Sequence, residues 1–329
     1  MSQRLLVVNK GELLFKAVTR VVPVIPVVFW FVYGSASETR SQPSLLKLKL
    51  GKTESLREVS KPDVFESNSE GNIFRSEKYL DSGHQPEKPV GRETEIQRIA
   101  QAIKPVRHGK TPENLLVHGP AGIGKSTTVK HVFDKFEDET SGKAVFINSW
   151  KYNTRPSLLT ELLIQFGYPA PRKGKPIDEL LSKIKEWLDK NRGVAVAIDE
   201  FDQLEDPTEV IYDLSMVNQE SQNSLGLVMV SNQPPQQVQL DPRSRSRLNC
   251  QTLQFQPYNA SQLQEILEKR AEKAFQPGAV PDEVIEAIAQ QVAENSGDCR
   301  TALKTLHKAG RKAEQEGETK ISIENLKMT

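Results

Sequence analysis

Cysteine is scarce in this sequence, and the scarcity excludes two kinds of fold. Cys250 and Cys299 are the only 2 cysteines among 329 residues. Two cysteines cannot build the disulfide framework of a small secreted protein, nor can they supply a cysteine-rich zinc site. The sequence therefore predicts a reducing compartment, and we expect a cytoplasmic protein.

The sequence also has no excess of positive or negative charge. The 44 Lys and Arg residues nearly balance the 43 Asp and Glu residues, which leaves a formal net charge of +1 at pH 7. This balance gives no global electrostatic argument for binding nucleic acid. Any DNA contact must therefore depend on a local group of basic residues.

The chain also has no apolar run long enough to cross a membrane as a helix. Residues 21–33 are apolar, but they contain Pro23 and Pro26 and are shorter than the roughly 20 residues that a spanning helix needs. Three interpretations of residues 1–60 stay open: translated sequence upstream of the true start, a poorly ordered extension or partner segment, or a membrane or export signal. We expect no membrane partner, and we interpret residues 61–91 as a segment that connects to the organised chain.

The sequence does contain a complete phosphate-binding motif. Residues 119–127 match G-x-x-x-x-G-K-[ST], follow a short apolar run at residues 114–118, and precede a segment with helical spacing. The strand–loop–helix order lets main-chain N–H groups and the helix N-terminus surround phosphates, which makes a chance glycine turn the weaker interpretation. The predicted nucleotide-binding residues are Gly119, Pro120, Ala121, Gly122, Ile123, Gly124, Lys125, Ser126 and Thr127, with Lys125 on the phosphates and Ser126 on Mg²⁺.

Two carboxylates follow a second buried strand. Residues 193–198 are small or β-branched and apolar, and Asp199 and Glu200 come next. In a parallel sheet, ligands bind at this edge, so we expect Asp199 to hold Mg²⁺ and Glu200 to polarise the attacking water. Taken alone, the pair could equally begin a helix, but Lys125 and Ser126 favour the catalytic interpretation.

Two further features lie between this strand and residue 255. The apolar run at residues 225–231 ends at Asn232, whose amide could orient a water molecule or simply form a turn. Arg243, Arg245 and Arg247 alternate with other residues, which is typical of either an arginine finger for a neighbouring subunit or a solvated basic loop.

The order of elements predicts the fold class. Apolar runs near residues 114–118, 143–148, 193–200, 225–232 and 251–255 alternate with helical patterns, which indicates a three-layer α/β fold. From residue 259 onward the pattern is helical, with Asn259 and Gln262 spaced as a capping box. Arg300 falls at the start of a third helix there, where a cation is slightly unfavourable unless it meets an anion.

These motifs together resemble the AAA+ ATPases. Within that class, residues 148–155 (NSWKYNTR), 240–243 (LDPR), 255–260 (FQPYNA) and 262–271 (QLQEILEKRA) resemble the archaeal replication initiators related to the origin recognition complex. The resemblance covers about residues 73–327. It implies a P-loop AAA+ three-layer sandwich with a five-stranded parallel sheet at residues 92–258 and a small helical lid at residues 259–329.

The resemblance also implies a role for each matching residue. Lys125 and Ser126 correspond to the Walker A pair, Asp199 and Glu200 to the Walker B pair, Asn232 to sensor 1 and Arg300 to sensor 2. Arg247 corresponds best to the arginine finger, with Arg243 as its competitor. Val90, Gly91 and Arg92 fall where the family packs against adenine, so ATP or ADP with Mg²⁺ is the expected cofactor.

The expected partners follow from the same family. Residues 152–163 fall where initiators insert a helix that touches double-stranded DNA, and Lys151 and Arg155 are the local basic residues. Other initiator subunits, a replicative helicase, or a homo- or hetero-oligomer joined through Arg247 are further expected partners. The winged-helix domain that normally follows the lid is absent from this sequence, which would weaken or abolish DNA binding.

The leading hypothesis is therefore an ATP-binding replication initiator in which slow hydrolysis acts as a conformational switch. One alternative is a nucleotide-dependent partner of a full-length initiator, with little DNA binding of its own. Another is a different AAA+ ATPase, such as a clamp-loader-like protein.

Overall fold

The computed structural model describes residues 73–169, 174–191, 193–238, 240–242 and 250–326. All of them belong to one compact unit, residues 63–329. The extension at residues 1–60 and the two candidate finger residues, Arg243 and Arg247, lie outside the described residues. No described helix is long and apolar enough to cross a membrane.

A five-stranded parallel sheet forms the centre of the first domain, as the sequence predicts. The strands lie in the order β2-β3-β4-β1-β5. Every residue of β3 and β4 is buried, because these strands are central and covered on both faces. The strand bounds are Asn114–His118 for β1, Lys143–Asn148 for β2, Val194–Asp199 for β3, Leu225–Ser231 for β4 and Cys250–Gln254 for β5.

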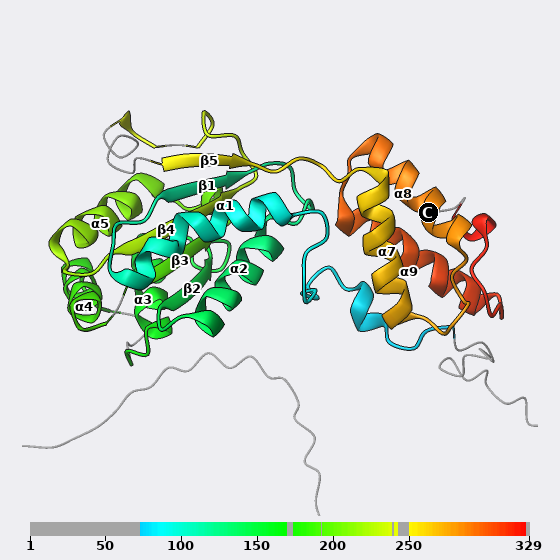
Figure 1. Ribbon diagram of the computed structural model, residues 1–329, viewed down its shortest axis with the longest axis horizontal. Coiled ribbons are helices and arrows are strands. Elements are labelled where there is room, and N and C mark those ends of the chain that lie inside the picture. Colours follow the sequence, from blue (N-terminus) through cyan, green and yellow to red (C-terminus); the bar gives the residue numbers. More distant parts are fainter. Residues whose placement is uncertain (1–72, 170–173, 192, 239, 243–249, 327–329) are drawn as a thin grey trace, which may run out of the picture. The chain divides into compact units, whose positions relative to one another are not determined.

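Helices cover both faces of the sheet and complete a three-layer sandwich (Figure 1). Alternate strand residues separate the two cores: Leu115 and Val117 face α1 and α2, whereas Leu116 packs with α3, α4 and α5. The helix bounds are Glu93–Ile103 for α1, Lys125–Glu139 for α2, Arg155–Gln165 for α3, Ile177–Lys190 for α4 and Pro207–Glu220 for α5. Single 3-10 turns, η2 (Lys104–His108) and η3 (Phe201–Gln203), follow α1 and β3.

The second domain is the predicted helical lid. Its helices are α7 (Ala260–Ala274), α8 (Asp282–Asn295) and α9 (Cys299–Gln315), followed by the 3-10 turn η4 (Ile323–Leu326). The side chains of Asn259 and Gln262 each accept a hydrogen bond from the other's main chain, so the predicted capping box is confirmed.

The segment before α1 is part of the lid core rather than only a connection. Ile73, Phe74 and Leu80 are buried among the lid helices, and a 3-10 turn, η1, spans Glu77–Leu80. Phe74 pairs with Phe275 in an antiparallel bridge, with ring centroids 4.7 Å apart. Gly310 of α9 makes room for this pair, because a Cβ there would lie 2.6 Å from both rings.

Candidate functional site

The predicted phosphate loop connects β1 to α2, and its glycines are required by geometry. Gly122 and Gly124 have φ angles of +76° and +88°, which L-residues with side chains rarely adopt. A Cβ on Gly124 would lie 2.4 Å from the Tyr258 hydroxyl, and one on Gly119 would lie 2.6 Å from the Phe255 carbonyl oxygen. The loop is therefore pressed against the linker that leads into the lid, and α2 begins directly at Lys125.

Lys125 lies buried at the mouth of the loop. Its Nζ donates to the carbonyl oxygens of Gly119 at 2.7 Å and Pro120 at 2.6 Å, and to Asn232 Oδ1 at 2.9 Å. Burial lowers the pKa of Lys125 to about 8, although the neighbouring carboxylates of Glu200 and Asp199 oppose this shift. A buried ammonium with only neutral hydrogen-bond acceptors is suited to receive an anion.

A hydroxyl and a carboxylate meet beside this lysine. Ser126 Oγ donates to Asp199 Oδ1 at 2.8 Å, and Asn148 Nδ2 lies 3.4 Å from Asp199 Oδ2. Oxygen donors of this kind are the ligands that Mg²⁺ prefers, usually with substrate phosphates completing the shell. Within the described residues, no group of three His, Cys, Asp or Glu side chains could hold a metal by itself. The pair therefore fits Mg²⁺ bound together with a nucleotide.

Glu200 is the only non-glycine residue with positive φ in the described chain, at φ 53°. This left-handed conformation turns the chain sharply after β3 and costs free energy, which is typical of functional sites. Its Oε2 accepts a 2.6 Å hydrogen bond from Asn232 Nδ2. Burial, followed by the charges of Asp199 and Asp202, raises the pKa of Glu200, as expected for a residue that accepts a proton.

Asn232 joins the two halves of this arrangement. Its amide oxygen accepts from Lys125 while its amide nitrogen donates to Glu200. Its main-chain N–H donates to Asp202 Oδ1 at 3.0 Å. One residue at the end of β4 thus links the phosphate-binding lysine to the candidate base, an arrangement that depends on β1, β3 and β4 being neighbours in the sheet.

The lid touches the phosphate loop directly. The N–H of Cys299, the first residue of α9, donates to the Gly122 carbonyl oxygen at 3.1 Å. Asp298 caps α9 by accepting from the Arg300 N–H at 2.8 Å and the Thr301 hydroxyl at 2.7 Å. Arg300 is exposed at this helix start, and its charge contributes to the lowered pKa of Lys125.

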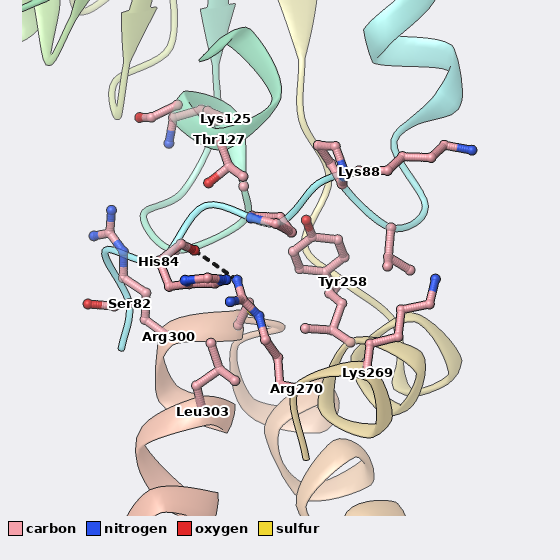
Figure 2. A pocket seen from close by; sticks show the side chains of 18 of the residues that line it. Ser82, His84, Lys88, Lys125, Thr127, Tyr258, Lys269, Arg270, Arg300 and Leu303 are labelled. Atoms are coloured by element: carbon pink, nitrogen blue, oxygen red, sulfur yellow. Dashed lines mark hydrogen bonds between the residues drawn. The ribbon is translucent and has the colours of Figure 1, made fainter. Parts of the chain in front are cut away.

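A cavity of about 320 Å³ connects these groups. Figure 2 shows Lys125 and Thr127 at one end, and Arg270, Lys269 and Leu303 of the lid at the other. The lining also includes Ser126, Asp199, Glu200, Asn232, Val90, Tyr258 and Arg300. The structure therefore brings together most of the site residues predicted from the sequence.

Arg92 does not line this cavity. It is 2% exposed, and its Nη2 donates to the carbonyl oxygens of Ile123 and Gln256, both at 2.8 Å. Its guanidinium stacks over the Tyr258 ring at 4.0 Å. Arg92 thus ties the phosphate loop to the linker before α7, whereas Gly91 accepts a hydrogen bond from Gln262. Contact with adenine stays a prediction, and among these three residues Val90 is the one that lines the cavity.

The candidate DNA-contact residues lie beyond β2, outside the cavity. Lys151 is exposed, next to Trp150, which is 74% exposed. Arg155 begins α3, and its guanidinium forms two 2.6 Å hydrogen bonds with Asp213 and a 3.0 Å ion pair with Glu209. DNA contact stays a prediction for both, but Arg155 would have to leave these carboxylates to meet a phosphate.

Three features of the site escape prediction from sequence. Asp202 gives a signal, as the third carboxylate in residues 199–202, but its contact with the Asn232 main chain depends on the sheet order. Ser82, His84, Pro86 and Glu87 line the cavity, although the sequence predicts no role for them. Arg270, in α7, belongs to the same unpredicted part of the cavity wall.

Comparisons with known proteins agree with this architecture. A model of the AAA ATPase domain matches residues 88–230, and one of the Cdc6 AAA+ ATPase-type lid domain matches residues 264–329. The ORC1-type DNA replication protein of Pyrococcus abyssi is 34% identical over 267 residues, which cover 77% of this chain and 64% of the relative. The ORC1-type DNA replication protein 1 of Sulfurisphaera tokodaii is 32% identical over 270 residues, covering 80% of this chain and 68% of the relative.

A solved structure of an ORC1 protein is also similar to this chain. The Aeropyrum pernix ORC1 protein, determined in complex with DNA, matches with a TM-score of 0.68 and 30% identity. The match covers 77% of this chain and 68% of that one. This chain therefore spans about two thirds of the length of the relatives that it matches.

Proposed function

We propose, on the premise that this chain belongs to the AAA+ family of ORC1-type DNA replication proteins, that it is an ATP-binding replication initiator with a nucleotide-controlled lid. One observation carries the proposal: the N–H of Cys299 in the lid contacts the Gly122 carbonyl oxygen of the phosphate loop. A nucleotide in this loop would meet the first turn of the lid, so its phosphates can set the position of the lid.

Each residue of the cavity has a distinct proposed role in ATP binding or hydrolysis. Lys125 and the α2 N-terminus would hold the phosphates, and Ser126 with Asp199 would hold Mg²⁺, which would neutralise charge on the phosphate oxygens. Glu200 polarises the attacking water and Asn232 orients it. Arg300 meets the terminal phosphate from the lid, and Arg247 of a neighbouring subunit is our candidate arginine finger, with Arg243 as its competitor.

Slow turnover is part of this proposal, and the contacts of Glu200 support it. Glu200 Oε2 is held at 2.6 Å by Asn232, whose amide oxygen is also held by Lys125. This hydrogen bond stabilises the ionised carboxylate, which opposes the transfer of a proton from water to Glu200. We therefore propose that ATP acts here as a conformational signal, and that hydrolysis resets the signal.

The proposed partners are double-stranded DNA, other initiator subunits and a replicative helicase, in the cytoplasm. The Aeropyrum pernix relative was determined with DNA, and Lys151, exposed next to Trp150, offers a cation to the phosphate backbone. The alternative is a regulator that pairs with another initiator and binds little DNA. The ion pairs of Arg155 with Asp213 and Glu209 favour that alternative, because they occupy a predicted DNA-contact residue.

DNA affinity measured against salt concentration separates these two functions. Fluorescence anisotropy with duplex DNA, in ATP and in ADP, should give an affinity that falls steeply with salt and differs between nucleotides. Lys151→Ala should reduce the salt slope by about one phosphate contact. Lys185→Ala, which removes an exposed lysine paired with Glu220, serves as the control. Negligible DNA binding by the wild-type chain would overturn the initiator proposal and favour the regulator.

A further inference from the structure

Besides Lys125, five cationic side chains line the cavity: three lysines, Arg270 and Arg300. Lys88, Lys269 and Lys273 each have a carboxylate within 4.0 Å: Glu93, Glu265 and Glu87, respectively. Arg270 has no carboxylate within that distance among the described residues. Its guanidinium instead donates to two main-chain carbonyl oxygens, of Tyr79 at 3.2 Å and His84 at 2.9 Å. Figure 2 shows the contact with His84 as a dashed line.

These two carbonyl groups flank a tight turn. The His84 N–H donates to the Asp81 carbonyl oxygen at 3.1 Å, and the Gly83 N–H donates to the Asp81 carboxylate at 2.9 Å. The rings of Tyr79 and His84 meet edge to face, with centroids 4.9 Å apart. Arg270 therefore closes the turn from the lid side, since its two terminal nitrogens have a fixed spacing.

The turn leads directly into the wall of the cavity. Residues 82–90, which we name the nucleoside wall, supply Ser82, His84, Pro86, Glu87, Lys88, Pro89 and Val90 to its lining. Lys125 and Thr127 of the phosphate loop belong to the other domain and lie at the other end (Figure 2). The nucleoside wall is thus placed to face the base and ribose of a nucleotide.

Burial of Arg270 has a free-energy cost that this role explains. Burial lowers the pKa of Arg270 from its ordinary value, because a cation is less stable away from water. Carbonyl oxygens return part of that cost through charge-assisted hydrogen bonds. A surface lysine would avoid the cost, but it could not hold two carbonyl groups at once.

We propose that Arg270 is a positioning residue for the nucleoside wall, so that it sets affinity for the base and ribose of the nucleotide without contacting the phosphates. This inference deepens the proposed function and depends on nucleotide binding at the phosphate loop. It predicts that loss of Arg270 affects ligands with a nucleoside and spares ligands that consist of phosphate alone.

Calorimetric titration of the full chain with ATP, ADP and inorganic tripolyphosphate, each with Mg²⁺, tests the proposal. Arg270→Ala should weaken ATP and ADP about tenfold or more and change tripolyphosphate affinity less than twofold. Arg270→Lys retains one possible donor and should give an intermediate loss. The single-turnover hydrolysis rate at saturating ATP should stay unchanged in both variants.

Arg311→Ala is the matched control. Arg311 also ties the segment before α1 to the lid, through Glu77 at 2.8 Å, but it does not line the cavity. Equal losses for ATP and tripolyphosphate in Arg270→Ala would overturn the proposal, and so would an equal loss of ATP affinity in Arg311→Ala. A wild-type chain that binds no ATP would instead refute the proposed function itself. Melting temperatures confirm that each variant is folded, and Arg270→Lys retains the test if Arg270→Ala is not.

Discussion

The two ends of the cavity are built from different parts of the chain. The phosphate end is built from the first domain, where residues 119–127, Asp199, Glu200 and Asn232 follow neighbouring strands of one parallel sheet. The nucleoside end is built from the lid helices and from residues 82–90, which lie far apart in the sequence. One end depends on a fixed sheet edge, and the other depends on the lid being in place.

We therefore expect the two ends to recognise different parts of a nucleotide, the phosphates at one end and the nucleoside at the other. Charge and backbone geometry at the phosphate end act on any ligand with a chain of phosphates. We expect packing at the nucleoside end to distinguish a nucleotide from phosphate alone, and to change when the lid moves. Substitutions at the two ends should therefore affect different ligands and different kinetic constants.

The largest expected effect is on hydrolysis, from Glu200→Gln at the phosphate end. Loss of a general base should slow single-turnover hydrolysis roughly 10²- to 10⁴-fold, because the amide cannot accept the proton. ATP affinity should change less than twofold, since Glu200 does not hold the phosphates. Glu220→Gln, at the end of α5, is the control. A large loss of ATP affinity with normal hydrolysis would place Glu200 in binding instead.

Lys125→Ala should have the next largest effect, and it should not distinguish between ligands. Removal of one charged contact costs about 1.5–3 kcal/mol, so ATP and tripolyphosphate should both bind roughly 10- to 150-fold more weakly. Calorimetry gives both values. Lys130→Ala, whose Nζ lies over the Phe146 ring, is the control on the same helix. Unchanged tripolyphosphate affinity would contradict the division between the two ends.

Gly122→Ala tests the contact between the phosphate loop and the first turn of α9. The new Cβ would lie 1.6 Å from Asp298 Oδ1, so the cap of α9 must move. The positive φ adds about 1–2 kcal/mol. ATP affinity should fall about tenfold, and amide hydrogen exchange in the first turn of α9 should increase. Gly317→Ala has a similar φ of +74° with nothing within 4 Å, so it isolates the backbone strain. Identical nucleotide affinities for the two variants would show that the contact with Asp298 is unimportant.

The smallest expected effect concerns the support of the nucleoside end. His307 and Arg311 donate to Glu77, and these contacts hold the pKa of Glu77 below its ordinary value. The stabilisation is therefore complete above about pH 4.5 and is lost as the pH falls through the lowered pKa. Glu77→Gln should lower the melting temperature slightly at neutral pH, and the difference from wild type should shrink below pH 4.5. A difference that stays constant with pH would contradict the ion pair.

Which residues lie together at the phosphate end could be predicted from the sequence, while their roles in binding and hydrolysis stay predictions. Buried strands are apolar runs, and their carboxyl ends meet at one edge, so Lys125, Ser126, Asp199, Glu200 and Asn232 could be assigned together. The hydrogen bonds of Asn232 to both Lys125 and Glu200 required the strand order as well, because β4 lies beside β1 and β3.

Apart from Val90, which the family resemblance places against adenine, the nucleoside end could not be predicted, for a physical reason. Ile73, Phe74 and Leu80 belong to the lid core although more than 170 residues separate them from α7. Local periodicity contains no information about such a contact. Arg92 illustrates the same limit, since its side chain binds the Ile123 and Gln256 carbonyl groups, and nothing in residues 90–93 indicates either partner.

The lid's use of residues 73–80 has a mechanical consequence. The chain crosses between the two domains twice, near Gly91 and again at residues 255–259, and Arg92 and Gln262 join the two crossings through Gln256 and Gly91. A single crossing permits bending and twisting in every direction, whereas two joined crossings define an axis. The lid should therefore rotate about the line between these crossings, and this rotation carries the start of α9 toward or away from Gly122.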